Sequence, residues 1–116
     1  MMRSNIKSGA ETFQTAIASH TSTAAETSFT SGTASLANGA VGKPVNIKCS
    51  GSITGLVQIT YGANATKAVP VIPNGSPVDL KIPPGSYPNA VNSITVDFEC
   101  TGGVGTLIAV VEFQKS

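Results

Sequence analysis

The sequence predicts an all-β protein: a small antiparallel β-sandwich, immunoglobulin-like or jelly-roll-like, with an extended N-terminal arm. Three observations lead to this prediction. In the second half of the chain, apolar and polar residues alternate with a period of two, which is typical of half-buried strands. Sequences rich in Gly and Pro separate these runs. The first forty residues are instead dominated by Ser, Thr, Ala and Gly.

Residues 1–40 are predicted to form the arm. They hold too little apolar surface to offset the entropy of ordering their backbone, so we expect them to order on a partner. Their large apolar side chains are widely spaced: Ile6, Phe13, Ile17, Phe29 and Leu36. A short helix over residues 10–19 and an edge strand within residues 26–36 remain open alternatives.

Residues 41–116 are predicted to form the sandwich domain, with six short strands. Pro70 cannot donate a ladder hydrogen bond, so its strand is expected at a sheet edge or a bulge. The last run is apolar on both faces as far as Glu112, which indicates a central or interface strand. The six expected strands are residues 44–50, 54–62, 67–73, 76–85, 92–102 and 106–114.

The two cysteines, Cys49 and Cys100, end two similar stretches, "VNIKCSG" and "VDFECTG". Both continue the series of every second, apolar residue in their strands, so both thiols should point inward. We expect free buried thiols. A disulfide remains an alternative. By closing the loop between the two cysteines it would stabilise the folded chain by about 4 kcal/mol. It requires an oxidising compartment, however, and the chain begins without the apolar run of a secretory signal.

The spacing of these cysteines resembles that of the paired cysteines in the immunoglobulin fold. The resemblance covers two strands. The chain departs from that family because it has no Trp, and because Phe98 stands two residues before Cys100, where the family has its tyrosine corner. The resemblance therefore supports a sandwich and not an antibody-type domain.

Composition and motifs indicate no enzyme, no metal site and no cofactor. Only 11% of residues are charged, against about 25% in typical domains, and the formal net charge is +1. We therefore expect no binding to nucleic acid or membranes. His20, the single His, falls in the predicted arm, without the rigid placement of a catalytic base. Asp97 and Glu99 share a strand face and could bind Ca²⁺ or act as acid and base, but Lys48 or solvent explains them more simply.

The remaining class is a structural assembly protein. In size, composition and layout the whole chain resembles the capsid decoration (cement) proteins of tailed bacteriophages. The resemblance implies a virion subunit that is assembled in the host cytoplasm, forms a homo-oligomer such as a trimer, and clamps major capsid or other assembly subunits through its arm. The alternatives are an adhesin or pilin-like subunit that donates a strand, and a carbohydrate-binding β-module. The predicted partner contacts are Phe13, Ile17, Phe29 and Leu36 in the arm, with Ile108 and Val110 in the last strand.

Overall fold

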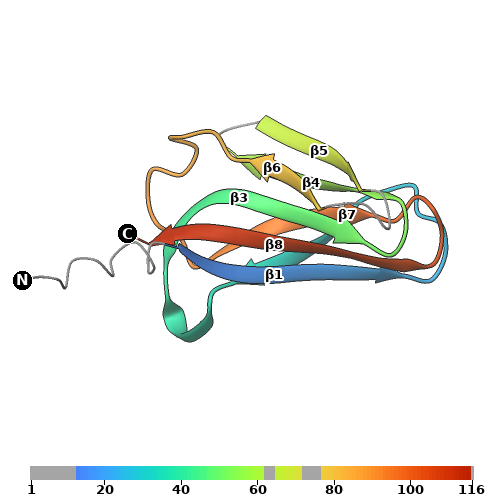
Figure 1. Ribbon diagram of the computed structural model, residues 1–116, viewed down its shortest axis with the longest axis horizontal. Coiled ribbons are helices and arrows are strands. Elements are labelled where there is room, and N and C mark those ends of the chain that lie inside the picture. Colours follow the sequence, from blue (N-terminus) through green and yellow to red (C-terminus); the bar gives the residue numbers. More distant parts are fainter. Residues whose placement is uncertain (1–12, 62–64, 72–76, 116) are drawn as a thin grey trace, which may run out of the picture.

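The computed structural model describes residues 13–61, 65–71 and 77–115. Two four-stranded antiparallel sheets pack face to face as a sandwich (Figure 1), which confirms the predicted fold class. One sheet has the strand order β1-β8-β3-β6 and the other β2-β7-β4-β5. The strands are β1 Phe13–Ser22, β2 Thr30–Ser35, β3 Gly42–Gly51, β4 Gly55–Tyr61, β5 Ala65–Val71, β6 Val78–Lys81, β7 Ser93–Glu99 and β8 Gly105–Lys115. A short 3-10 turn, Ala37–Gly39, follows β2.

The strand pairing is nested. β1 pairs with β8, β2 with β7, β3 with β6 and β4 with β5, all antiparallel. The chain is thus one long hairpin of four strand pairs. Successive pairs alternate between the sheets: β1-β8 and β3-β6 lie in one sheet, and β2-β7 and β4-β5 lie in the other. Eight strands arranged in this way form a jelly roll. Of the two expected topologies, the structure has the jelly roll.

The core lies between the two sheets and follows the predicted alternation. Ile94, Val96 and Phe98 of β7 are buried. On β8 every second side chain from Leu107 to Phe113 is fully buried, while its neighbours are half-buried on the outer face. β8 lies between β1 and β3, which confirms its prediction as a central strand. β5, which contains Pro70, lies at a sheet edge, also as predicted.

One irregularity in β3 changes the predicted alternation. The register between β3 and β8 shifts between Pro44 and Asn46, where β3 contains a bulge. As a result Val45, which was expected to face the core, is only half-buried. Asn46, which was expected to face solvent, is buried and donates a hydrogen bond from Nδ2 to Glu112 Oε1 at 3.2 Å.

The predicted arm is wrong over residues 13–40, because β1 and β2 are strands of the sandwich itself. All ten residues of β1 pair with β8, so backbone hydrogen bonds to a central strand order this segment. Its inward positions include Ala16 and Ala18, which are buried although they are too small to give a strong apolar signal. The helix alternative for residues 10–19 fails from residue 13 onward, whereas the edge-strand alternative is confirmed by β2. The first twelve residues lie outside the described part of the chain.

Within the described residues, the structure contains no helix that is long and apolar enough to cross a membrane.

Candidate partner-contact face

Four of the six predicted contact residues have side chains on the outer face of the sheet β1-β8-β3-β6. They are Phe13 and Ile17 of β1 with Ile108 and Val110 of β8, and we call these four residues the contact face. Phe13 is 53% exposed and Ile17 is 62% exposed. Ile108 and Val110 are half-buried.

The strand register explains why three of these side chains meet, while Phe13 pairs with Gln114 farther along β1. Ile17 pairs directly with Val110, and Ser19 with Ile108, so Ile108 is a diagonal neighbour of Ile17. Directly opposed side chains on an antiparallel pair lie about 5 Å apart, and diagonal ones are still within reach of long side chains. Two segments about ninety positions apart in the sequence thereby build one apolar surface.

The same outer face becomes polar on its other two strands. Lys48 of β3 lies opposite Val110, and Asp79 of β6 lies opposite Lys48. In the next row, Glu112 of β8 and Lys81 of β6 both pair with Asn46 of β3. The apolar side chains of this face therefore lie on β1 and β8, and the charged ones lie on β3 and β6 and, at Glu112, on β8. Apolar side chains bordered by polar and charged ones are a common feature of protein–protein interfaces.

The remaining two predicted contact residues do not belong to this face. Leu36 is only 6% exposed and packs in the core, so its prediction as a partner contact is wrong. Its backbone N–H donates to the Asn92 carbonyl oxygen at 2.8 Å, and the Asn92 side chain donates back to the Leu36 carbonyl oxygen at 3.2 Å. Phe29 is half-buried in the connection between β1 and β2.

Both cysteines are free, fully buried thiols in the structure, and they belong to different sheets. Cys49 of β3 lies between Val78 and Ala109 on its neighbouring strands. Burial, together with the negative charge of Asp79, raises the pKa of the Cys49 thiol to about 11. Cys100 directly follows β7.

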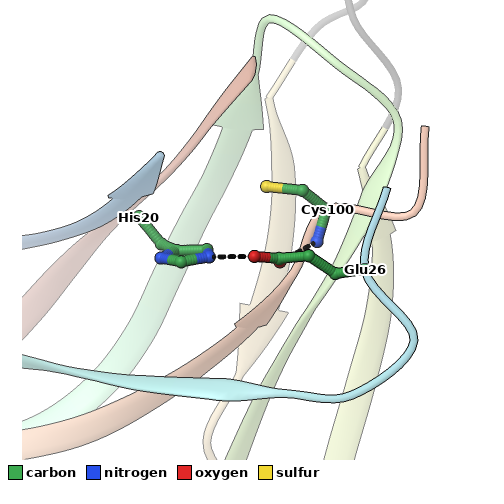
Figure 2. A group of neighbouring side chains, drawn as sticks. All are labelled: His20, Glu26 and Cys100. Carbon is green, nitrogen blue, oxygen red and sulfur yellow. Dashed lines mark hydrogen bonds and ion pairs between the residues drawn. The ribbon is translucent and has the colours of Figure 1, made fainter. Parts of the chain in front are cut away.

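Cys100 belongs to a polar cluster at one end of the sandwich (Figure 2), together with His20 and Glu26. His20 Nε2 lies 2.7 Å from Glu26 Oε2. The Cys100 backbone N–H donates to Glu26 Oε1 at 2.8 Å. The Cys100 N–H and then the His20 ring lower the pKa of the Glu26 carboxyl, so Glu26 is a carboxylate.

Lys48 is not the charge partner of Asp97 and Glu99, because Lys48 lies on the other sheet. Asp97 instead accepts a hydrogen bond from the Ser31 hydroxyl, with 2.6 Å between the oxygens. The explanation of these carboxylates by Lys48 is therefore wrong, since the two similar stretches that contain Cys49 and Cys100 belong to separate sheets.

A cavity of about 320 Å³ lies where the connection between β6 and β7 passes the first residues of β3. Its walls include Pro83, Pro84 and Tyr87, with Lys43 and Gln114 as polar members. Burial raises the pKa of the Tyr87 hydroxyl. The size is at the lower limit for small-molecule sites, which start at about 300 Å³.

The sequence reading missed the cluster of His20, Glu26 and Cys100. His20 was assigned to the arm because its segment has no strong apolar alternation. The signal that could have placed it is the even-numbered series Ala16, Ala18, His20, which puts the His on the inward parity of a strand. No sequence pattern shows that this strand ends beside Cys100.

Comparison with protein families, with curated proteins and with solved structures gave no match.

Proposed function

We propose that the protein is a non-enzymatic structural assembly subunit that binds its partners through the contact face. The single observation that supports this proposal is the exposure of Ile17 beside Val110 and Ile108 on one sheet face, with the exposed Phe13 four positions away on the same strand. Neighbouring β-branched side chains on a surface lose contact with water when a partner covers them, and each buried CH₂ group contributes about 0.8 kcal/mol. Apolar residues that are scattered singly over a surface are normal and do not indicate a binding face.

Within this class, the proposed role is a decoration subunit of a viral capsid, with major capsid subunits and further copies of the chain as partners. Jelly rolls occur in viral capsid proteins, but also in lectins and cupins, so the fold is only an analogy for this role. The low share of charged residues supports a surface that is partly covered in an assembly. The proposed contact is the flat face of a sheet, in place of the clamping arm that the sequence indicated.

The contact face is tested by sedimentation velocity over a concentration series. The wild-type chain should associate, with a trimer as the expected species. The double variant Ile17→Thr/Val110→Thr keeps β-branched side chains but removes apolar surface, so it should associate at least tenfold more weakly, a loss of about 1.4 kcal/mol. Val104→Thr is the matched control, because Val104 is 69% exposed in the connection between β7 and β8, away from the face. Equal association of the double variant and the wild type would contradict the proposal.

The decoration role needs a second experiment. Tailed particles from cells that encode the chain should contain it, detected by mass spectrometry, in amounts comparable to the shell subunit. If the particles lack it, the decoration role is wrong whatever the oligomeric state. If the isolated chain is a monomer but the particles contain it, the capsid subunit is the partner. The proposal that the chain associates with itself is then wrong.

A carbohydrate-binding module is the second candidate, and the cavity beside Tyr87 favours it. A sugar ring would pack on the Tyr87 ring, with Lys43 and Gln114 as hydrogen-bond donors to its hydroxyls. In a glycan-array experiment, binding that Tyr87→Ala abolishes would support this candidate. The adhesin or pilin-like alternative loses its main support, since residues 13–22 already pair with β8 of the same chain.

A further inference from the structure

His20, Glu26 and Cys100 come from three separate segments and converge at one end of the sandwich. His20 lies near the end of β1, Glu26 in the connection between β1 and β2, and Cys100 directly after β7. β1 and β7 belong to different sheets, so the cluster bridges the two layers. Figure 2 shows the His20 ring and the Glu26 carboxylate pointing toward each other, with Cys100 beside them.

The cluster is polar at a position where the fold calls for apolar side chains. His20 has the same inward parity on β1 as the buried Ala16 and Ala18, and its ring stacks on that of Phe98, with 6.2 Å between the ring centroids. Conflict between a local residue choice and its structural position is typical of functional sites. A His and a Glu placed beside a buried thiol are such a conflict.

We propose that His20, Glu26 and Cys100 form a binding site for a divalent transition metal ion, with Zn²⁺ as the best fit. One imidazole nitrogen, one carboxylate oxygen and one thiolate sulfur are the donor types that Zn²⁺ accepts. Three protein ligands leave the fourth tetrahedral position for water. The His20 and Glu26 side chains are 18% and 22% exposed, so solvent reaches these two ligands.

The geometry needs only small adjustments. The three donor atoms lie within 4.8 Å of one another. Around a tetrahedral Zn²⁺ ion, ligand distances of about 2.0 to 2.3 Å place the donors about 3.3 to 3.6 Å apart. His20 Nε2 and Glu26 Oε2, now 2.7 Å apart, must separate by less than about 1 Å, and the thiol must approach by no more than about 1.5 Å.

The surrounding hydrogen bonds would hold the ligands in place. Glu26 Oε1 stays bonded to the Cys100 N–H, which leaves Oε2 for the metal. The Glu26 backbone N–H also donates to the Cys100 carbonyl oxygen at 2.9 Å, so these two ligands are tied at both ends. Metal binding through these atoms would require a thiolate at Cys100 and a His20 ring without a hydrogen on Nε2.

The site is independent of the proposed contact face. Ile17 and His20 have opposite parity on β1, so one faces outward and the other toward the interior. A bound ion would link both sheets at the end where the connection between β7 and β8 lies. The metal would stabilise the folded chain whatever partner covers the outer face.

The first test uses Co²⁺ as the probe, with the full chain, free of any histidine tag, reduced and stripped with a chelator. Co²⁺ bound to a thiolate in a tetrahedral site has intense visible bands and a sulfur-to-cobalt charge-transfer band. One equivalent should produce these bands in the wild type, and Zn²⁺ should displace the Co²⁺. The bands should be lost in Cys100→Ser and kept in Cys49→Ala, the matched control at the other buried cysteine. Their absence in the wild type, or their survival in Cys100→Ser, would overturn the proposal.

A second measurement is needed in case Cys100→Ser does not fold. The chain contains one His, so the ring signals in its NMR spectrum belong to His20 without further assignment. Addition of one equivalent of Zn²⁺ to the wild type should shift these signals. In calorimetric titrations with Zn²⁺, His20→Gln and Glu26→Gln should each bind at least about tenfold more weakly. Unshifted His20 signals, or unchanged affinities, would show a hydrogen-bonded structural cluster instead.

Discussion

At the scale of single residues, β1 contributes to two different sites, because side chains at odd-numbered and even-numbered positions point to opposite faces of the strand. Ile17 and His20 are three positions apart on β1, yet Ile17 is exposed and His20 stacks on Phe98 inside the sandwich. The two cysteines are both buried, but their surroundings differ. Cys49 lies among apolar neighbours with a raised thiol pKa, whereas Cys100 has the His20 and Glu26 side chains beside it.

The raised pKa of Cys49 predicts a loss of stability at alkaline pH. The thiol has a folded-state pKa of about 11, above the ordinary value of 9.0. Its contribution is therefore fully present below about pH 9 and is lost as the pH rises from 9 toward 11, because the unfolded chain releases the proton first. Denaturant unfolding at pH 8 and at pH 10 should show this decline.

Other groups also titrate in that range, so the comparison is with Cys49→Ala. The variant should have a smaller decline in the free energy of unfolding than the wild type over the same interval. Identical declines would mean that the Cys49 thiol does not contribute to the pH dependence.

At the scale of elements, β8 has two functions in one strand. Its odd-numbered side chains from Leu107 to Phe113 fill the core, and its even-numbered side chains Ile108 and Val110 supply half of the contact face. This division is possible because β8 is a central strand, hydrogen-bonded to β1 on one side and β3 on the other. Substitutions on the two faces should therefore have separate effects.

Two neighbouring substitutions on β8 test this division. Leu107→Ala removes a fully buried side chain and should lower the free energy of unfolding by about 2 to 5 kcal/mol. Ile108→Ala removes a half-buried side chain on the outer face and should lower it by less than about 1.5 kcal/mol while weakening association. Urea denaturation measures the stability and sedimentation measures the association. A larger stability loss for Ile108→Ala would contradict the assignment of faces.

At the scale of the whole molecule, the nested pairing makes the first strands indispensable. β1 and β2 complete one sheet each, and the segment from Ala16 to Leu36 contributes four residues to the core. Without them β7 and β8 would become edge strands, and their inner faces would lose their cover. An unprotected long edge strand is prone to aggregation.

Truncation is therefore expected to destroy the fold. A fragment of residues 41–116 should fail to unfold cooperatively in a thermal scan, and it should aggregate. A fragment of residues 13–116 is the matched control, since it retains all eight described strands and should unfold cooperatively. A cooperative transition in the shorter fragment would mean that residues 13–40 form a separable arm after all. Limited proteolysis of the full chain checks the same point, because cleavage between residues 13 and 40 should be slow.

The sequence by itself determined the fold class, the inward parity of both cysteines and the central place of β8. These features depend on local alternation and turn chemistry, which are visible in any short window. Tertiary structure alone decided the topology, the inclusion of β1 and β2, which of the predicted contact residues meet, and the cluster of His20, Glu26 and Cys100. β1 is ordered by β8, about ninety positions away, and its inward Ala16 and Ala18 are too small to produce a pattern. The meeting of Ile17 with Val110, and of His20 with Cys100, depends on long-range pairing and packing, which no local pattern encodes.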